Sequence, residues 1–137
     1  MSVFVDTSAW FAAADAGDRS HARAKEILSS GEPLVTTDHV LAETWTLLRY
    51  RIGRHAAERF WEGLRAGVAQ IELTGTADLE TAYEIGQRFP DQGFSIVDRT
   101  SFAVMQRLGI QTAASFDNDF AVFRFGRNLD RAFTVMR

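Results

Sequence analysis

The most constraining feature of the sequence is a short, fully apolar run that ends at an aspartate. The run Val3-Phe4-Val5 is followed at once by Asp6, Thr7 and Ser8. Such a run favours a central strand of a parallel sheet, because helices cover both faces of that strand. In open parallel sheets the reactive groups lie just beyond the carboxyl ends of the strands, which is where Asp6 stands. An alternative role for Asp6 is to cap a helix that begins at Ser8.

Strand-like and helix-like segments alternate along the whole chain. We expect strands at residues 2–6, 34–36, 70–73, 111–116 and 132–136, and helices at residues 8–14, 19–29, 38–51, 55–66, 77–89 and 96–108. The polar and apolar residues of 70–73 alternate, as is typical of an edge strand, and residues 120–126 fit no element clearly. The alternation predicts one domain over residues 1–137, an α/β sandwich built around a parallel sheet.

Composition narrows the class of protein. The chain has no cysteine, which excludes disulfides and thiolate metal sites. It has no apolar stretch long enough to span a bilayer and no basic-then-apolar signal at its N-terminus, so we expect a soluble, cytoplasmic protein without a membrane contact. The net charge is −3, yet Lys25 is the only lysine among 15 basic residues. Arginine suits bidentate phosphate contacts, although most arginines here fit ordinary surface positions equally well.

Two acids stand where apolar side chains are expected. Glu43 shares a helix face with Val40, Leu47 and Tyr50, at spacings of three, four and seven residues. A carboxylate on a buried stripe needs a partner or a bound cation, and such a break in an otherwise consistent pattern tends to mark a functional site.

Asp98 repeats this pattern one turn into another predicted helix. Phe102 and Met105 follow it on the same face. Asp98 also stands three residues after Ser95, which is the spacing of a capping box. The two roles are compatible, because a helix N-terminus favours a carboxylate.

A third group of acids follows the predicted strand at 111–116. Asp117 comes directly after that strand, and Asp119 stands two residues later as a weaker or water-mediated contributor, or as a solvated turn residue. If Asp6, Glu43, Asp98 and Asp117 converge, their repulsion requires compensation. An all-oxygen set without cysteine suits a hard divalent ion such as Mg²⁺ or Mn²⁺.

These segments together resemble the PIN-domain ribonucleases, specifically the VapC-type toxins of toxin–antitoxin pairs. The resemblance covers essentially the whole chain and rests on four short segments in the family's order: residues 5–10, residues 41–44, residues 95–98 and residues 115–120. It implies a three-layer α/β/α sandwich around a parallel sheet of about five strands. It also implies Mg²⁺- or Mn²⁺-dependent cleavage of RNA phosphodiester bonds.

The resemblance assigns roles to individual residues. It implies that Asp6, Glu43, Asp98 and Asp117 form the catalytic, metal-binding set. The hydroxyl of Ser8 supports this set, as does Ser115, at a position that the family usually fills with Thr. It further implies a homodimer and a cognate antitoxin, which can insert a basic side chain into the acidic site.

From this set we expect metal-assisted hydrolysis with one or two ions. Asp6, Glu43 and Asp98 would hold the first ion, and Asp117, alone or with Asp98, would hold a second where two ions act. RNA must reach a negatively charged pocket, so we expect arginines at its rim, with Arg49, Arg51, Arg54 and Arg99 as the candidates.

Other function classes fit the sequence less well. A phosphatase of the haloacid dehalogenase type requires a second aspartate where Ser8 stands, and a receiver domain requires a lysine at a strand end, whereas Lys25 lies in a predicted helix. The remaining alternative is a non-catalytic PIN-like scaffold that binds RNA or protein.

Overall fold

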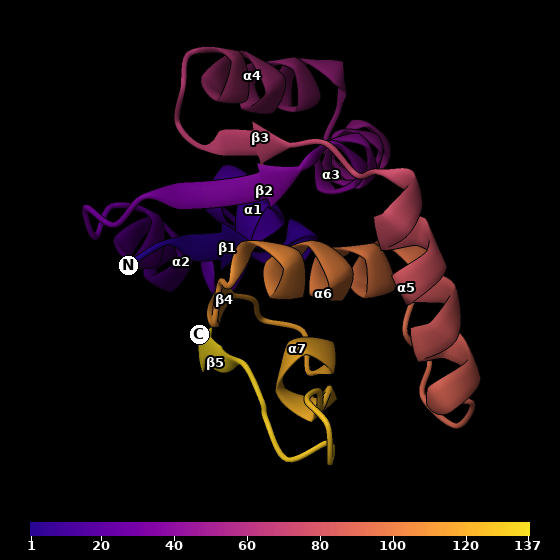
Figure 1. Ribbon diagram of the computed structural model, residues 1–137. Coiled ribbons are helices and arrows are strands. Elements are labelled where there is room, and N and C mark those ends of the chain that lie inside the picture. The colour runs from indigo at the N-terminus through magenta and orange to yellow at the C-terminus, as the bar shows by residue number, and fades with distance from the viewer.

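The fold is built on one five-stranded sheet, seen in a computed structural model that describes residues 1–137 (Figure 1). All four strand pairings are parallel, and the strand order is β3-β2-β1-β4-β5. The strands are β1 (Val3–Val5), β2 (Leu34–Thr37), β3 (Gln70–Glu72), β4 (Thr112–Ala114) and β5 (Thr134–Met136). The prediction of a parallel sheet with its centre at the first strand is therefore confirmed, and β3 is an edge strand as expected.

Seven helices accompany the sheet. They are α1 (Thr7–Ala14), α2 (His21–Leu28), α3 (Asp38–Arg51), α4 (Arg54–Arg65), α5 (Thr76–Arg88), α6 (Ile96–Leu108) and α7 (Asp119–Val122). The six predicted helices are present, with ends that shift by one or two residues. Helix α7 was not predicted; it is a single turn that begins at a site aspartate. No helix is long and apolar enough to cross a lipid bilayer.

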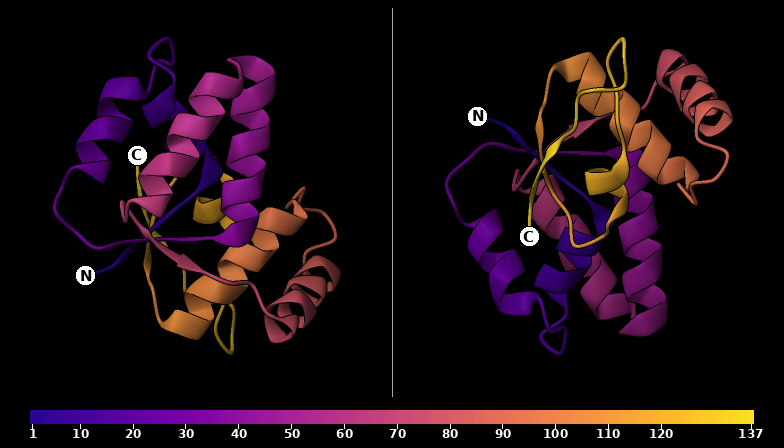
Figure 2. Two further views of the ribbon diagram at one scale, coloured as in Figure 1. Left: turned by 90° about the horizontal axis from the view of Figure 1, so that it is seen from above. Right: turned by 90° about the horizontal axis from the view of Figure 1, so that it is seen from below.

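The direction of winding reverses at the centre of the sheet. The chain moves from β1 outward to β2 and β3, and then returns through α5 and α6 to β4 on the other side of β1. Figure 2 shows the result, with α1 to α4 on one face of the sheet and α5 and α6 on the other. The carboxyl ends of β1 and β4 lie at this reversal, which is where open α/β sheets bind their ligands.

The buried face of α3 differs from the prediction. Val40, Thr44 and Leu48 are its buried residues, whereas Tyr50 is 84% exposed. The predicted stripe is therefore wrong at Tyr50, whereas Leu47 is half-buried beside the core. At about 100° of rotation per residue, Tyr50 lies roughly 120° around the helix from the middle of the arc that Val40, Thr44 and Leu48 cover. In α5, Leu79 and Tyr83 are exposed, and the helix buries Asp78, Ala82 and Ile85.

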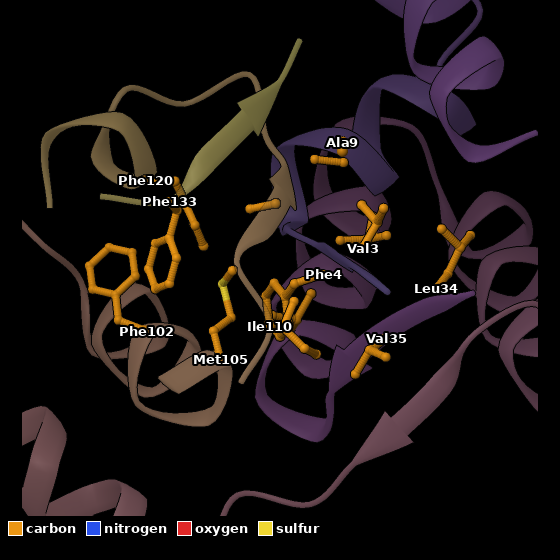
Figure 3. Packing of buried hydrophobic residues seen from close by; sticks show 14 of the residues in the cluster. Val3, Phe4, Ala9, Leu34, Val35, Phe102, Met105, Ile110, Phe120 and Phe133 are labelled. Atoms are coloured by element: carbon orange, nitrogen blue, oxygen red, sulfur yellow. The ribbon is translucent and has the colours of Figure 1, made fainter. Parts of the chain in front are cut away.

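A group of phenylalanines fills the space between the sheet and α6. Phe102 stacks on Phe123 with their ring centroids 4.2 Å apart, and meets Phe120 edge-on at 4.9 Å. Phe120 in turn stacks against Phe4 of the central strand. Figure 3 shows Phe102, Phe120 and Phe133 together beside Met105, next to the sheet. This packing holds α7 against α6, and it thereby places the acids at the starts of these two helices side by side.

Candidate active site

Asp6 lies at the end of the central strand, almost entirely hidden from solvent. Its side chain is 3% exposed, and its Oδ2 accepts hydrogen bonds of 3.0 Å from the hydroxyls of Ser8 and Ser115. Burial raises the pKa of Asp6 to about 6, and the charge of Asp117 adds to that rise, while both hydroxyls oppose it. Asp6 occupies the N-cap position of α1, but its side chain makes no capping hydrogen bond. The carboxylate is therefore directed to the site rather than to its own helix.

The two serines link the end of β1 to the end of β4. The backbone N–H of Phe116 donates to Ser8 Oγ at 2.9 Å, and the N–H of Asp117 donates to Ser115 Oγ at 3.2 Å. The two hydroxyl oxygens are 3.2 Å apart. This network positions Asp6 relative to Asp117, which is the geometry that a supporting role for both hydroxyls requires.

Glu43 comes to the site from α3, and its carboxylate is half-buried. Its Oε1 accepts a 2.6 Å hydrogen bond from the hydroxyl of Thr7, which directly follows Asp6. Glu43 lies beside the buried stripe of α3 rather than on it, so the argument that it occupies a buried face was wrong. What holds the carboxylate is a single partner at the start of α1. Sequence analysis did not single out Thr7, although its position next to Asp6 was a signal.

Asp98 lies at the start of α6 and serves two purposes. Its N–H donates to Ser95 Oγ at 3.0 Å and its Oδ2 accepts from the N–H of Ser95 at 3.0 Å, which completes the predicted capping box. Burial raises the pKa of Asp98 to about 8, and a hydrogen bond with Asp119 and the charge of Asp6 add to the rise. Ionisation of Asp98 is therefore disfavoured unless a positive charge lies close to its carboxylate.

Three carboxylates lie close enough together to bind one metal ion. Oxygen atoms of Asp98, Asp117 and Asp119 all lie within 4.8 Å of each other. Burial also raises the pKa of Asp119, and the charge of Asp117 contributes. Asp119 was expected to be a weaker contributor or a solvated turn residue, yet it belongs to this close group, whereas Asp6 and Glu43 do not.

The donor set fits a hard divalent cation. All the converging atoms are carboxylate oxygens, which Mg²⁺, Mn²⁺ and Ca²⁺ prefer. None of the four predicted acids, nor Asp119, forms an ion pair with a basic side chain. Carboxylates that are crowded, partly buried and without a basic partner are the arrangement that a bound cation would stabilise.

The printed contacts of the predicted RNA-binding arginines do not involve the site acids. The guanidinium of Arg51 lies over the ring of Phe11 at 5.5 Å, and Arg54 pairs with Glu58. Arg99 donates from Nε to the carbonyl of Phe94 at 3.1 Å. Arg49 is exposed near the end of α3. Contact of these residues with RNA stays a prediction.

Known proteins are similar to this chain in both sequence and fold. A PIN-domain family model matches residues 3–126. The chain is 46% identical over 125 residues to the 23S rRNA-specific endonuclease VapC20 of Mycobacterium tuberculosis, which covers 90% of this chain and 95% of that protein. It is 30% identical over 116 residues to the ribonuclease VapC26 of the same organism, covering 84% of this chain and 86% of the relative.

Solved structures agree with the sequence comparison. The crystal structure of Mycobacterium tuberculosis VapC20, described as a sarcin–ricin loop cleaving toxin, matches with a TM-score of 0.82 and 43% identity, covering 87% of this chain and 92% of that one. VapBC2 from Rickettsia felis matches with a TM-score of 0.64 at 12% identity, covering 86% and 89%, which shows a shared fold. Together with the carboxylates gathered at the reversal of the sheet, these similarities show that the chain belongs to the PIN-domain family and is an endoribonuclease of the VapC type.

Proposed function

We propose that residues 1–137 act as a single nuclease domain that cleaves the sarcin–ricin loop of 23S rRNA, using Mg²⁺ or Mn²⁺. The observation that carries the metal-dependent part is the crowding of Asp6, Asp98, Asp117 and Asp119 without a basic partner. The choice of RNA is supported by 46% identity over 90% of the chain to an endonuclease specific for 23S rRNA. It is further supported by 43% identity to a structure described as a sarcin–ricin loop cleaving toxin.

The acids would hold the ion in a defined arrangement. Asp98, Asp117 and Asp119 offer three oxygens within 4.8 Å of one another, and these are the first candidates for direct ligands. Asp6 is outside this group and acts electrostatically on Asp98. Glu43, held by Thr7, would reach the ion through water, since Mg²⁺ usually keeps several of its waters. When bound, a divalent ion supplies a Lewis acid that generates a nucleophile from water near neutral pH.

Hydrogen bonds within the protein fix the orientation of two of these carboxylates. The hydroxyls of Ser8 and Ser115 hold Asp6 in one position, and the capping box holds Asp98 at the first turn of α6. Both acids are therefore set by rigid elements rather than by loops, which keeps the reacting groups within the narrow tolerance that catalysis needs.

The decisive experiment is cleavage of intact ribosomes with mapping of the RNA ends. We expect one cut in the sarcin–ricin loop in Mg²⁺ or Mn²⁺ and none in EDTA. Asp6→Asn and Glu43→Gln should each abolish cleavage, whereas Asp91→Asn, which removes a carboxylate from an exposed loop, should not. Cuts spread over other RNAs would contradict the proposed substrate. Full activity in both site variants would contradict the assignment of these acids, and binding without cleavage would favour a non-catalytic scaffold.

A homodimer is the proposed assembly. Tyr50, Leu79, Tyr83 and Ile96 are large apolar side chains that are between 42% and 84% exposed. Ile96 lines both the groove that contains Tyr50 and the groove that contains Leu79 and Tyr83, so the apolar surface runs continuously across α3, α6 and α5. Surfaces of this kind usually mark an interface. We expect Ile96→Glu to sediment as a monomer at concentrations where the parent protein is a dimer.

A cognate antitoxin is the second proposed partner, and the cytoplasm, where ribosomes are, is the proposed location. An antitoxin arginine or lysine entering the site would face Asp6, Asp98 and Asp119, whose pKa values are all raised and which therefore favour a nearby positive charge. We expect such an antitoxin to compete with the divalent ion, so that its inhibition weakens as the concentration of Mg²⁺ is raised.

A further inference from the structure

Arg137 lies at the same edge of the sheet as the acids. It directly follows β5, whose Met136 is in register with Ala114 of β4. The N–H of Ser115 donates to the carbonyl of Met136 at 3.2 Å, which continues the pairing one step further. Arg137 is thus placed after β5 in the way that Asp6 is placed after β1. The sheet edge at which the acids lie therefore also carries a basic residue.

A hydrogen bond ties this arginine to the acidic segment. Nη1 of Arg137 donates to Oδ1 of Asn118 at 3.1 Å, and Asn118 stands between Asp117 and Asp119. The side chain is exposed, and no carboxylate comes within ion-pair distance of it. The guanidinium is bonded to a residue that stands between two acids in the chain, yet it forms an ion pair with neither of them.

The other candidate arginines contact residues outside the acidic site. Arg51 stacks over Phe11, and Arg99 donates to the backbone carbonyl of Phe94. Neither contact involves a residue of the acidic site. Among the arginines whose contacts are described above, only Arg137 is bonded to the segment that carries two of the site carboxylates.

The chemistry of this position fits a phosphate group. An acidic pocket repels the polyanion that it must cleave, so the substrate needs a cation close to the scissile bond in addition to the divalent ion. A guanidinium with one N–H fixed by an amide still presents further N–H groups, and its planar fork matches phosphate oxygens. We propose that Arg137, oriented by Asn118, binds a phosphate of the RNA next to the one that is cleaved. This inference rests on the proposed function, because it assumes an RNA substrate.

Binding to a hairpin with the sequence of the sarcin–ricin loop tests the proposal. The measurement is made in the Asp6→Asn protein, which should bind without cutting, over a series of KCl concentrations. Arg137→Gln should weaken binding roughly tenfold or more, as the loss of one charge-assisted contact predicts. It should also make the slope of log K against log[salt] shallower by about 0.7–0.9, because one phosphate is no longer neutralised. In the cleaving protein the same change should raise KM and leave kcat within about twofold.

Three matched variants separate charge from position. Arg65→Gln removes the same charge from the end of α4, which precedes β3 at the opposite edge of the sheet, and it should change neither affinity nor slope. Arg137→Lys keeps the charge and should keep the parent's salt slope. Asn118→Ala releases the guanidinium, so it should weaken binding by less than Arg137→Gln does and leave the slope unchanged.

The outcomes distinguish the inference from the function on which it rests. If the parent protein cleaves the hairpin and Arg137→Gln behaves like Arg65→Gln, the assignment of Arg137 is overturned and the proposed function stands. If Arg137→Gln lowers the melting temperature but leaves Kd and the salt slope unchanged, its role is structural and the assignment is overturned as well. If the parent protein neither binds nor cleaves this RNA, both proposals fail.

Discussion

The hydroxyl of Thr7 donates a 2.6 Å hydrogen bond to Oε1 of Glu43, and this bond joins the first turn of α1 to the middle of α3. Thr7 is buried and directly follows Asp6. The bond therefore links Glu43 to the residue next to Asp6, although the two acids lie 37 positions apart in the chain. Glu43 depends on it, because no other side-chain hydrogen bond holds its carboxylate.

Removing the Thr7 hydroxyl should damage activity more than stability. Thr7→Val keeps the shape of the side chain and deletes the donor, so Glu43 loses its orientation. Partners that orient metal-site groups typically contribute about 10–100-fold to activity, and we expect kcat/KM to fall within that range. Thr7→Ser keeps the hydroxyl and serves as the control. Equal activity of the two variants would show that this bond does not position Glu43.

The stability of the metal-free protein should fall as pH rises. Burial raises the pKa of Asp6 from 3.8 to about 6, and burial is also the main cause that raises the pKa of Asp98 from 3.8 to about 8. Between about pH 4 and pH 8 the folded state therefore binds more protons than the unfolded state, so the free energy of unfolding decreases as pH increases. The stabilising contribution is complete below about pH 4 and is lost as pH passes through each folded-state pKa.

Thermal melts in EDTA from pH 5 to pH 8 check this expectation. Asp98→Asn keeps the capping geometry but cannot ionise, so its melting temperature should decline less than that of the wild type between pH 6 and pH 8. Asp91→Asn alters an exposed loop carboxylate and should follow the wild type across the range. A wild-type curve parallel to that of Asp98→Asn would refute the raised pKa.

Divalent ions should reverse this destabilisation. A ligand that binds only the folded state stabilises it by about 2.7 kcal/mol at 100 times its Kd. We expect the melting temperature at pH 7.5 to rise with MgCl₂ or MnCl₂ in the wild type. The midpoint of that titration should shift at least tenfold in Asp117→Asn and in Asp119→Asn, because each removes one of three clustered oxygens. Asp130→Asn is the control in the same region of the chain, and a titration identical to the control in both site variants would refute the cluster as a metal site.

A separate ion-pair network should support the fold without contributing to chemistry. Arg107 donates from Nε and Nη2 to the two oxygens of Asp78, each at 3.0 Å, and from Nη1 to Glu72 at 3.0 Å. Asp78 is 4% exposed, and these hydrogen bonds from Arg107 are the main cause of its lowered pKa. Arg107→Met keeps the aliphatic stem but strands a buried carboxylate, at a cost of roughly 2–3 kcal/mol for a pair that is open to solvent on one side.

This network lies at the C-terminal end of α6, whereas Asp98 lies at its first turn. We therefore expect Arg107→Met to unfold at a lower denaturant concentration and still to cleave at the wild-type rate at low temperature. The double variant with Asp78→Asn should lose less stability than the sum of the two single changes. Additive losses would show that the two side chains do not interact.

Local patterns in the sequence were sufficient for the scaffold and for the placement of Asp6 after the central strand and of Asp98 at the start of a helix. The apolar run before Asp6 predicts a central strand, and the spacing of Ser95 and Asp98 predicts a capping box; both are present. These features depend on neighbours only a few residues apart, so the sequence carries them directly. The tail after residue 119 was harder to interpret, because α7 is one turn long and is held by contacts of Phe120 with distant rings rather than by its own residues.

The sequence by itself determined the parallel sheet, the acids at its carboxyl edge and the suitability of an oxygen-rich site for a hard cation, since each follows from residue type and short-range periodicity. Only the tertiary structure decided which face of α3 is buried, that Asp119 rather than Asp6 or Glu43 lies with Asp98 and Asp117, and that Arg137 bonds to Asn118. The buried face of α3 depends on how α1 and α4 pack against it, and the other two outcomes depend on how α6, α7 and β5 are brought together across long stretches of chain. No local pattern encodes such distances, because they are set by the combined packing of many side chains.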